Sequence, residues 1–351
     1  MLRFLRALRY LTKEAFRLCR TQPGPDTVIR NLHACVPMLG RSTGEQPLFR
    51  EAVARMQLYC LRHGMPTRPI ILTGYPKSGN TLTRLVYYNL IAATKTGATE
   101  TMTYTRLNRV DPNHTFPFGL LQEGFVEPAN FDLSGFPLLL VTHQRWEPFW
   151  DEVGDVLFIA RHPLDSLIGH WYNSVAFPEE PEEDIDIDPF VLRELPDWIG
   201  LYRANKVRAK ALLHYEAIMA DAQRAFGVAF RALGVSFGSE HLKRAVAMTS
   251  FNKVRAMEDA YGEHHGHAAD PIRRKQAGDR AWRHAPGVRF TRSGQIGQWR
   301  DALKPETIGR AKAMLREAGL VQYATLSHEV DADSEARRGS VLAMAAPNSH
   351  P

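Results

Sequence analysis

Two hydrophobic patterns alternate along the middle of the chain. Short apolar runs occupy residues 69–74, 137–142, 155–160 and 211–215, and the runs at 137–142 and 155–160 lack in/out alternation. Runs of this kind are typical of strands that are buried on both faces of a parallel sheet. Stretches with helical spacing of apolar residues lie at 43–64, 82–93, from Pro163 onward, 191–210 and 217–233, where Gly234 supplies a stop. Strands that alternate with helices predict a three-layer α/β/α fold with a central parallel sheet.

The two ends of the chain have a different pattern. Residues 1–20 place a cation at every third or fourth position between apolar residues, which predicts a basic amphipathic helix. This helix either attaches to an anionic membrane surface or packs on the domain or a partner. The cations interrupt every apolar stretch, so we expect neither a signal peptide nor a transmembrane helix, and a cytoplasmic location. We expect a helix and linker at 1–40, one domain at 41–325 and a disordered tail at 326–351.

Composition and charge narrow the class of protein. A chain of 351 residues with 44% apolar content can bury a large core, and its net charge of +6 suits polyanionic ligands. No zinc-finger, RRM or basic-zipper pattern supports nucleic acid as the partner. We predict no metal site and a reducing compartment, because the cysteines form an odd set without C-x-x-C spacing: Cys19, Cys35 and Cys60. The histidine cluster at 264–267 has no cysteine beside it and suits a solvated loop.

The first apolar run leads directly into Tyr75-Pro76-Lys77-Ser78-Gly79-Asn80-Thr81 and then into a helix-compatible stretch. A strand, a tight loop and a helix in this order form a phosphate cradle, because the amides of the loop and first turn point outward. Gly74 and Gly79 have the separation of the Walker A glycines, but Asn80 stands where that motif has its lysine. Lys77 lies inside the loop instead. The pattern therefore predicts a phosphorylated ligand other than a nucleoside triphosphate bound in the usual way.

This loop resembles the 5′-phosphosulfate loop of PAPS-dependent sulfotransferases, written P-K-[ST]-G-[TN]-[TS]. Further matches in the family's order extend the resemblance from about Ile70 to about Leu303. It implies the P-loop-like sulfotransferase fold, PAPS (3′-phosphoadenosine 5′-phosphosulfate) as the sulfuryl donor and no metal. The 5′-phosphate would be held by the amides of four residues, with the Thr81 hydroxyl: Ser78, Gly79, Asn80 and Thr81. The Lys77 ammonium would neutralise charge on the leaving oxygen.

The resemblance also implies a general base. Val141-Thr142-His143 matches the last two positions of the family's K-T-H string, with Val141 in place of the lysine. His143 follows the second apolar run, at the sheet edge where open α/β folds place their chemistry. An imidazole with a pKa near the working pH can accept a hydroxyl proton.

Two strings resemble the family's 3′-phosphate site. Residues 158–167 match its strand and helix and place Arg161 at the sheet edge. The family's serine eight residues later is Gly169 here, and Ser166, one turn earlier, is a candidate to replace it. Residues 292–299 resemble R-K-G-x-x-G-[DQ]-W, which implies phosphate contacts from Arg292, Ser293 and Gly294. Ser293 replaces a lysine, which removes one cation.

Two aromatic residues are candidates for contact with the purine. Tyr215 lies in a string that resembles the family's F-Y-E-D, and Thr249-Ser250-Phe251 matches its T-S-F. Phe251 would stack on the purine, with Thr249 beside it. By periodicity alone, both aromatic side chains could equally be core residues.

The resemblance thus implies in-line transfer of a sulfuryl group from PAPS to a hydroxyl, or less favourably an amine, of a small-molecule, sugar or lipid acceptor. We expect the acceptor pocket to come from residues 99–136 and 262–288, and an acidic loop at 178–189. The alternatives are a P-loop kinase, which Asn80 disfavours, and a non-catalytic nucleotide-binding protein, which would have no use for His143.

Overall fold

The computed structural model describes residues 47–97, 102–103, 106–107, 131–176, 186–261 and 293–325. The predicted basic helix at 1–20, the loop at 262–288, Arg292 and the tail at 326–351 lie outside these residues, as do most of the predicted acceptor loop at 99–136 and of the acidic segment. Within the described ranges, no helix is long and apolar enough to cross a membrane. The same ranges hold no cluster of three or more residues suited to bind a metal ion.

The four apolar runs form one parallel sheet, as predicted. Its strands are β1 (Ile70–Thr73), β2 (Leu139–Thr142), β3 (Asp155–Ala160) and β4 (Ala211–His214), in the order β2-β1-β3-β4. All of β1 and β2 and nearly all of β3 are buried, as the continuous apolar runs require. In the pairing of β3 with β4, Ala160 lies opposite His214. The next residues, Arg161 and Tyr215, therefore leave the sheet side by side.

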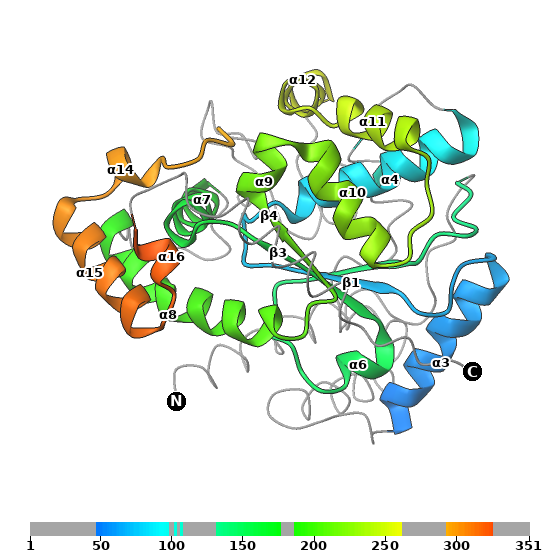
Figure 1. The fold of residues 1–351 in the computed structure, drawn as a ribbon, viewed down its shortest axis with the longest axis horizontal. Coiled ribbons are helices and arrows are strands. Elements are labelled where there is room, and N and C mark those ends of the chain that lie inside the picture. The colour runs from blue at the N-terminus through cyan, green and yellow to red at the C-terminus, as the bar shows by residue number, and fades with distance from the viewer. Residues whose placement is uncertain are drawn as a thin grey trace, which may run out of the picture. The chain divides into compact units, whose positions relative to one another are not determined.

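Helices surround these strands (Figure 1). They are α3 (Pro47–Arg62), α4 (Asn80–Thr96), α6 (Trp150–Val153), α7 (Pro163–Ala176), α8 (Ile187–Lys206), α9 (Tyr215–Ala220), α10 (Ala222–Ala232), α11 (Ser239–Met248), α12 (Phe251–Tyr261), α14 (Trp299–Ala302), α15 (Pro305–Glu317) and α16 (Val321–Ala324). The predicted helices before and after β1, after β3 and before β4 are confirmed.

The helix predicted over 217–233 is wrong as a single element. Asp221 adopts an extended backbone and separates α9 from α10, and its carboxylate accepts a 2.9 Å hydrogen bond from the Arg224 amide. Aspartate is a favoured N-cap because it satisfies an amide of the first turn in this way. Tyr215, predicted at the end of a strand, is the first residue of α9, and Gly234 has the predicted left-handed conformation.

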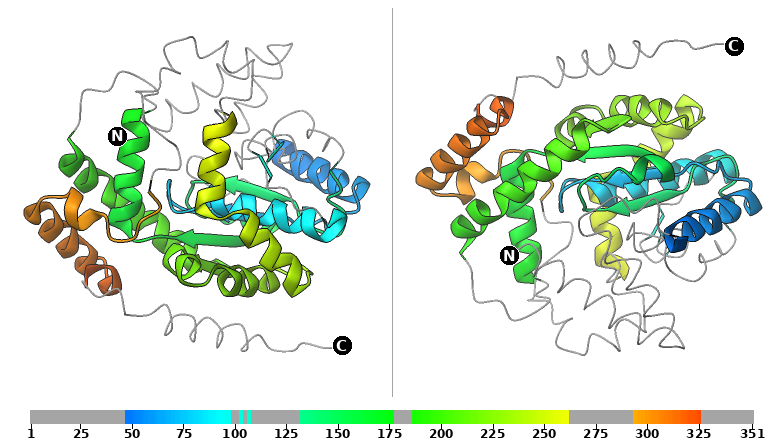
Figure 2. Two further views of the ribbon diagram at one scale, coloured as in Figure 1. Left: turned by 90° about the horizontal axis from the view of Figure 1, so that it is seen from above. Right: turned by 90° about the horizontal axis from the view of Figure 1, so that it is seen from below.

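The described residues fall into two compact units. The first comes from Met1–Ile71, Val110–Thr142 and Trp146–Asp155. Within it, Arg68 bridges to Asp155 at 2.7 Å. The second unit comes from Leu72–Arg109, His143–Arg145 and Val156–Pro351. It packs α4 against α11, α7 against α8, and α10 against β4 (Figure 2). Every described candidate site residue belongs to the second unit, and the single domain at 41–325 stays a prediction.

Candidate active site

The loop between β1 and α4 has a strained backbone. Lys77 has a φ of 67°, and among the described residues it is the only non-glycine residue with a positive φ. Such a conformation costs an L-residue about 1–2 kcal/mol. The Arg161 guanidinium donates a 3.2 Å hydrogen bond to the Lys77 carbonyl and helps to hold it. At Gly79, where φ is 115°, an added Cβ would lie 2.9 Å from Ile159 Cδ1, so the loop requires glycine there.

The amides of this loop divide into two sets. The Ser78 amide donates to the Tyr75 carbonyl at 3.1 Å, so it is already used inside the loop. The amides of Gly79, Thr81 and Leu82 have no hydrogen-bond partner among the described residues. They lie where α4 begins, and the positive end of a helix favours an anion. The arrangement therefore offers donors for a phosphate group from Gly79 onward.

Ser78 and Ser166 support the loop from inside the protein. Their hydroxyl oxygens lie 3.2 Å apart, and both residues are completely buried. A contact in this position joins the loop to α7. The structure thus gives Ser166 a partner within the fold, and its predicted part in phosphate binding stays a prediction.

His143 is placed by a backbone carbonyl. Its Nδ1 lies 2.7 Å from the Gly74 carbonyl oxygen. A carbonyl oxygen can only accept, so Nδ1 carries a proton and the neutral ring keeps its lone pair on Nε2. The Asn80 amide nitrogen is 3.5 Å from the same Nδ1, but both atoms carry hydrogens in this tautomer, so no hydrogen bond forms between them. The contact with Gly74 therefore selects the tautomer in which Nε2 can accept a proton.

The surroundings of His143 keep it neutral. Desolvation by the surrounding protein atoms lowers the pKa of His143 from 6.5. The hydrogen bond to Gly74 raises this pKa, and the positive charges of Lys77 and Arg84 lower it further. By accessible surface the residue is exposed, although many protein groups surround the ring. The imidazole is thus neutral near pH 7 and reachable, as a general base must be.

Helix α7 passes close to the lysine. A Cβ built on Gly169 would lie 3.1 Å from Lys77 Cβ, so the glycine makes room for the lysine stem. The next residue, His170, contacts the Tyr75 hydroxyl at 3.2 Å through Nδ1. Its pKa is lowered to about 4, chiefly by burial and then by the nearby His143, Lys77 and Arg193. His170 adds no positive charge beside Lys77 at neutral pH, and the sequence motifs did not indicate it.

Arg161 is a buried cation with an unsatisfied donor. The residue is 6% exposed. Its guanidinium donates to the Gln295 carbonyl at 2.7 Å and lies 4.4 Å from the centre of the Tyr215 ring. Its Nε has no hydrogen-bond partner among the described residues. Buried donors are rarely left unpaired, so an arginine held in this way indicates an anionic ligand.

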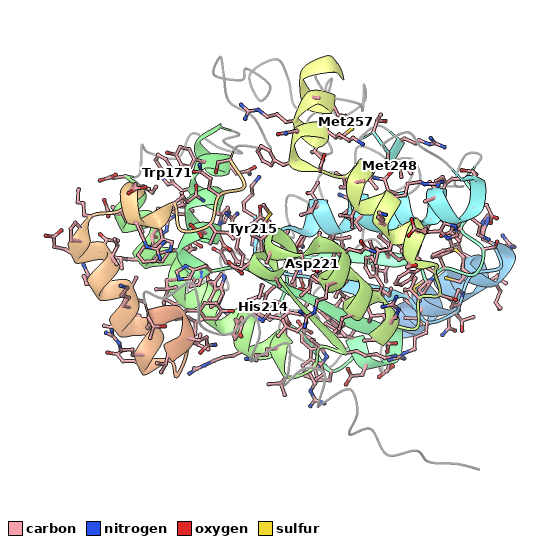
Figure 3. All side chains as sticks on the ribbon, turned by 45° about the horizontal axis from the view of Figure 1, so that its top comes forward. Trp171, His214, Tyr215, Asp221, Met248 and Met257 are labelled. Carbon is pink, nitrogen blue, oxygen red and sulfur yellow. The ribbon has the colours of Figure 1, made fainter. Side chains whose placement is uncertain are left out.

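Tyr215 and Phe251 meet at Gly294. The Tyr215 hydroxyl donates to the Gly294 carbonyl at 3.0 Å. A Cβ on Gly294 would lie 3.1 Å from both the Phe251 ring and the Tyr215 hydroxyl. Figure 3 shows Tyr215 where β4 passes into α9, with Met248 and Met257 on the two helices that flank Thr249. The structure thus brings three predicted site residues into contact, with Tyr215 joined to the late segment.

Two further buried residues, Asp165 and Thr249, lie on this side of the site. Asp165, a buried residue of α7, accepts a 2.7 Å hydrogen bond from the Gly297 amide and so fixes the segment that contains Ser293 and Gly294. Thr249 is 2% exposed; its hydroxyl donates to Ala245 at 2.7 Å and accepts from Asn89 at 3.1 Å. Its side chain thus serves helix packing, and its contact with a purine stays a prediction.

Comparison with known proteins covers this whole region. A family model described as a sulfotransferase domain matches residues 67–319. No curated protein matches the chain. A solved structure of retinol dehydratase in complex with androsterone and inactive cofactor PAP is 14% identical, with 78% of this chain and 94% of that chain covered and a TM-score of 0.51. Mouse sulfotransferase SULT7A1 complexed with PAP is 15% identical, with 84% and 96% covered and a TM-score of 0.47. The likeness to retinol dehydratase confirms the predicted fold.

Proposed function

Since this chain belongs to the sulfotransferase domain family, we propose that it transfers the sulfuryl group of PAPS to a hydroxyl of a small-molecule, sugar or lipid acceptor, with an amine as the second acceptor class. The 2.7 Å contact between His143 Nδ1 and Gly74 carries the proposal, because it leaves Nε2 as a proton acceptor. A protein that only held a nucleotide would gain nothing from a base in this state.

The donors of the site fit PAPS, which carries anionic groups at both the 5′ and the 3′ positions. The amides of Gly79, Thr81 and Leu82 suit the 5′-phosphate. The unpaired Nε of Arg161 suits the 3′-phosphate. Phe251, half-buried next to Gly294, is placed to stack on the purine.

PAPS supplies a sulfuryl group already attached to a good leaving group, the 5′-phosphate. His143 Nε2 takes the proton of the acceptor hydroxyl while its Nδ1–H stays bonded to Gly74, which stabilises the imidazolium that forms. The acceptor oxygen bonds to sulfur as the bond from sulfur to the phosphate oxygen breaks and leaves its electron pair on that oxygen. Lys77 and the loop amides stabilise the resulting charge, so no metal is required for that task.

Labelled PAPS and an acceptor panel test this reaction. The retinol dehydratase structure holds androsterone, so the panel begins with hydroxylated small molecules and continues with sugars and lipids. We expect label transfer by the wild type and its loss in His143→Ala. In thermal-shift measurements, 3′,5′-ADP should stabilise the protein more than ATP with magnesium, through ligand linkage. The reverse ranking would favour the kinase alternative.

We also propose a cytoplasmic enzyme with peripheral membrane contact through residues 1–20. The support is the spacing of six cations along this segment: Arg3, Arg6, Arg9, Lys13, Arg17 and Arg20. Deletion of the segment should lower binding to anionic liposomes and leave turnover in solution unchanged. Equal liposome binding by both forms would contradict the membrane role.

A further inference from the structure

A buried asparagine joins the ends of two neighbouring strands. Asn205, near the end of α8, is completely buried. Its side-chain nitrogen donates to the Thr73 hydroxyl at 3.1 Å and to the Gln144 carbonyl at 3.1 Å. The Thr73 hydroxyl in turn donates to the same carbonyl at 3.1 Å. An amide nitrogen has two hydrogens and a hydroxyl both accepts and donates, so all three bonds form together.

This triangle lies next to the candidate base. Thr73 precedes Gly74, and Gln144 follows His143. The hydrogen bond from His143 Nδ1 to Gly74 therefore joins the same two segments through the adjacent residue of each. Whatever fixes the distance between Thr73 and Gln144 also limits how far the imidazole can move from its acceptor.

We propose that Asn205 is a positioning residue for sulfuryl transfer, which holds the two strand ends at the spacing that keeps His143 Nδ1 bonded to Gly74 and its Nε2 directed to the acceptor. The inference rests on the proposed function, because that function makes His143 the base. Buried polar groups are costly unless they are hydrogen-bonded, and a fully satisfied network specifies one arrangement. A displacement of about 1 Å at a reacting group can cost on the order of 10²-fold in rate.

The chain offers a matched control. Asn89 of α4 is also completely buried; its side chain accepts from the Met102 amide at 2.9 Å and donates to Thr249 at 3.1 Å. These contacts involve neither Gly74 nor His143. Leucine has nearly the shape of asparagine without its donors, so Asn205→Leu and Asn89→Leu remove equal polar groups from equal burial. Only the first removes support from the base.

A double-mutant cycle tests the inference. We expect Asn205→Leu to lower kcat by roughly 10- to 100-fold, with the Kd for 3′,5′-ADP within about twofold of the wild type because the nucleotide contacts lie elsewhere. In a His143→Ala background the further loss should be below about twofold, since the positioned group is already absent. Any loss caused by Asn89→Leu should be equal in the two backgrounds. A normal kcat for Asn205→Leu, or the same loss with and without His143, overturns the proposal.

The imidazole itself gives a second measurement. Nitrogen-15 spectra of the labelled His143 ring should show the Nδ1–H tautomer in the wild type and a mixture with the Nε2–H tautomer in Asn205→Leu. Unchanged ring signals overturn the proposal even if turnover falls.

Two variants of Thr73 test the triangle if the leucine variant does not fold. Thr73→Val removes the hydroxyl and should lower kcat, whereas Thr73→Ser keeps the hydroxyl and should retain kcat. Equal kcat values for the two variants would overturn the proposal. An active His143→Ala enzyme would instead refute the proposed base, so the two failures are distinguishable.

Discussion

The two sides of the candidate site are held in opposite ways. On one side, the side chain of His143, the proposed base, is placed by a main-chain atom, the Gly74 carbonyl oxygen. On the other, a main-chain segment is placed by side chains: Arg161, Tyr215 and Asp165 bind the backbone of residues 294–297. A change on the first side should therefore affect the chemical step, expressed as kcat. A change on the second should affect nucleotide binding, expressed as KM for PAPS.

On the side that contains His143, removal of the proposed base should lower kcat most. We expect His143→Ala to lower kcat by roughly 10²- to 10⁴-fold, the usual worth of a general base. In the wild type, kcat/KM should fall on the acid side as the imidazole becomes protonated. Because the pKa of His143 is lowered, this acid limb should lie below pH 6.5. The pH profiles of both proteins check the result, and a wild-type limb centred above pH 6.5 would contradict a depressed pKa.

Removal of the lysine should have the next largest effect. Lys77→Ala should lower kcat by roughly 10²- to 10³-fold, because charge on the leaving oxygen loses its stabilisation. Steady-state kinetics at saturating PAPS measure the loss. Lys243→Ala, at a surface ion pair with Glu240, is the control and should retain normal rates. Near-normal turnover by Lys77→Ala would refute the role given to the lysine.

A smaller change should separate the two sides cleanly. Tyr215→Phe deletes only the hydroxyl that donates to Gly294 and keeps the ring under Arg161. Loss of one such hydrogen bond should raise KM for PAPS by roughly two- to tenfold and leave kcat nearly constant. Tyr172→Phe, on an exposed face of α7, serves as control. If kcat fell and KM did not change, Tyr215 would belong with the chemical side.

The smallest expected effect concerns α7. Gly169→Ala places a Cβ 3.1 Å from Lys77 Cβ, so the lysine must move by a few tenths of an ångström. We expect a loss in kcat of roughly tenfold or less. Gly309→Ala in α15 meets no atom within 4 Å and is the matched control. A rise in KM for PAPS that exceeds the fall in kcat would show that Gly169 of α7 affects nucleotide binding and not the position of the lysine.

The sheet could be predicted from sequence because burial on both faces of a strand leaves a continuous apolar run, and the observed strands begin and end within two residues of those runs. The break at Asp221 was missed because helical spacing of apolar residues continues across it. Helices α6, α11, α12, α14, α15 and α16 were not predicted.

The site divides in a similar way. Side-chain motifs indicated Lys77, His143, Arg161 and Tyr215, which the structure brings to one unit. The carbonyls of Gly74 and Gln295 could not be predicted, because a main-chain acceptor leaves no mark on residue type. Asn205 lies far from His143 in sequence, and only the chain topology brings them together. The family's serine is replaced by Gly169 here, and the structure supplies a steric reason that no motif contained, since a Cβ at this position would approach Lys77.

The left-handed backbone of Lys77 lowers stability at the position to which we assign a catalytic amine. Glycine would adopt that conformation without strain but carries no amine. Selection for thermal stability alone would therefore favour glycine at residue 77. Selection for turnover would retain the lysine, at the cost of a lower free energy of unfolding. Engineering for thermal stability should accordingly leave residue 77 unchanged and place stabilising substitutions in segments remote from the loop.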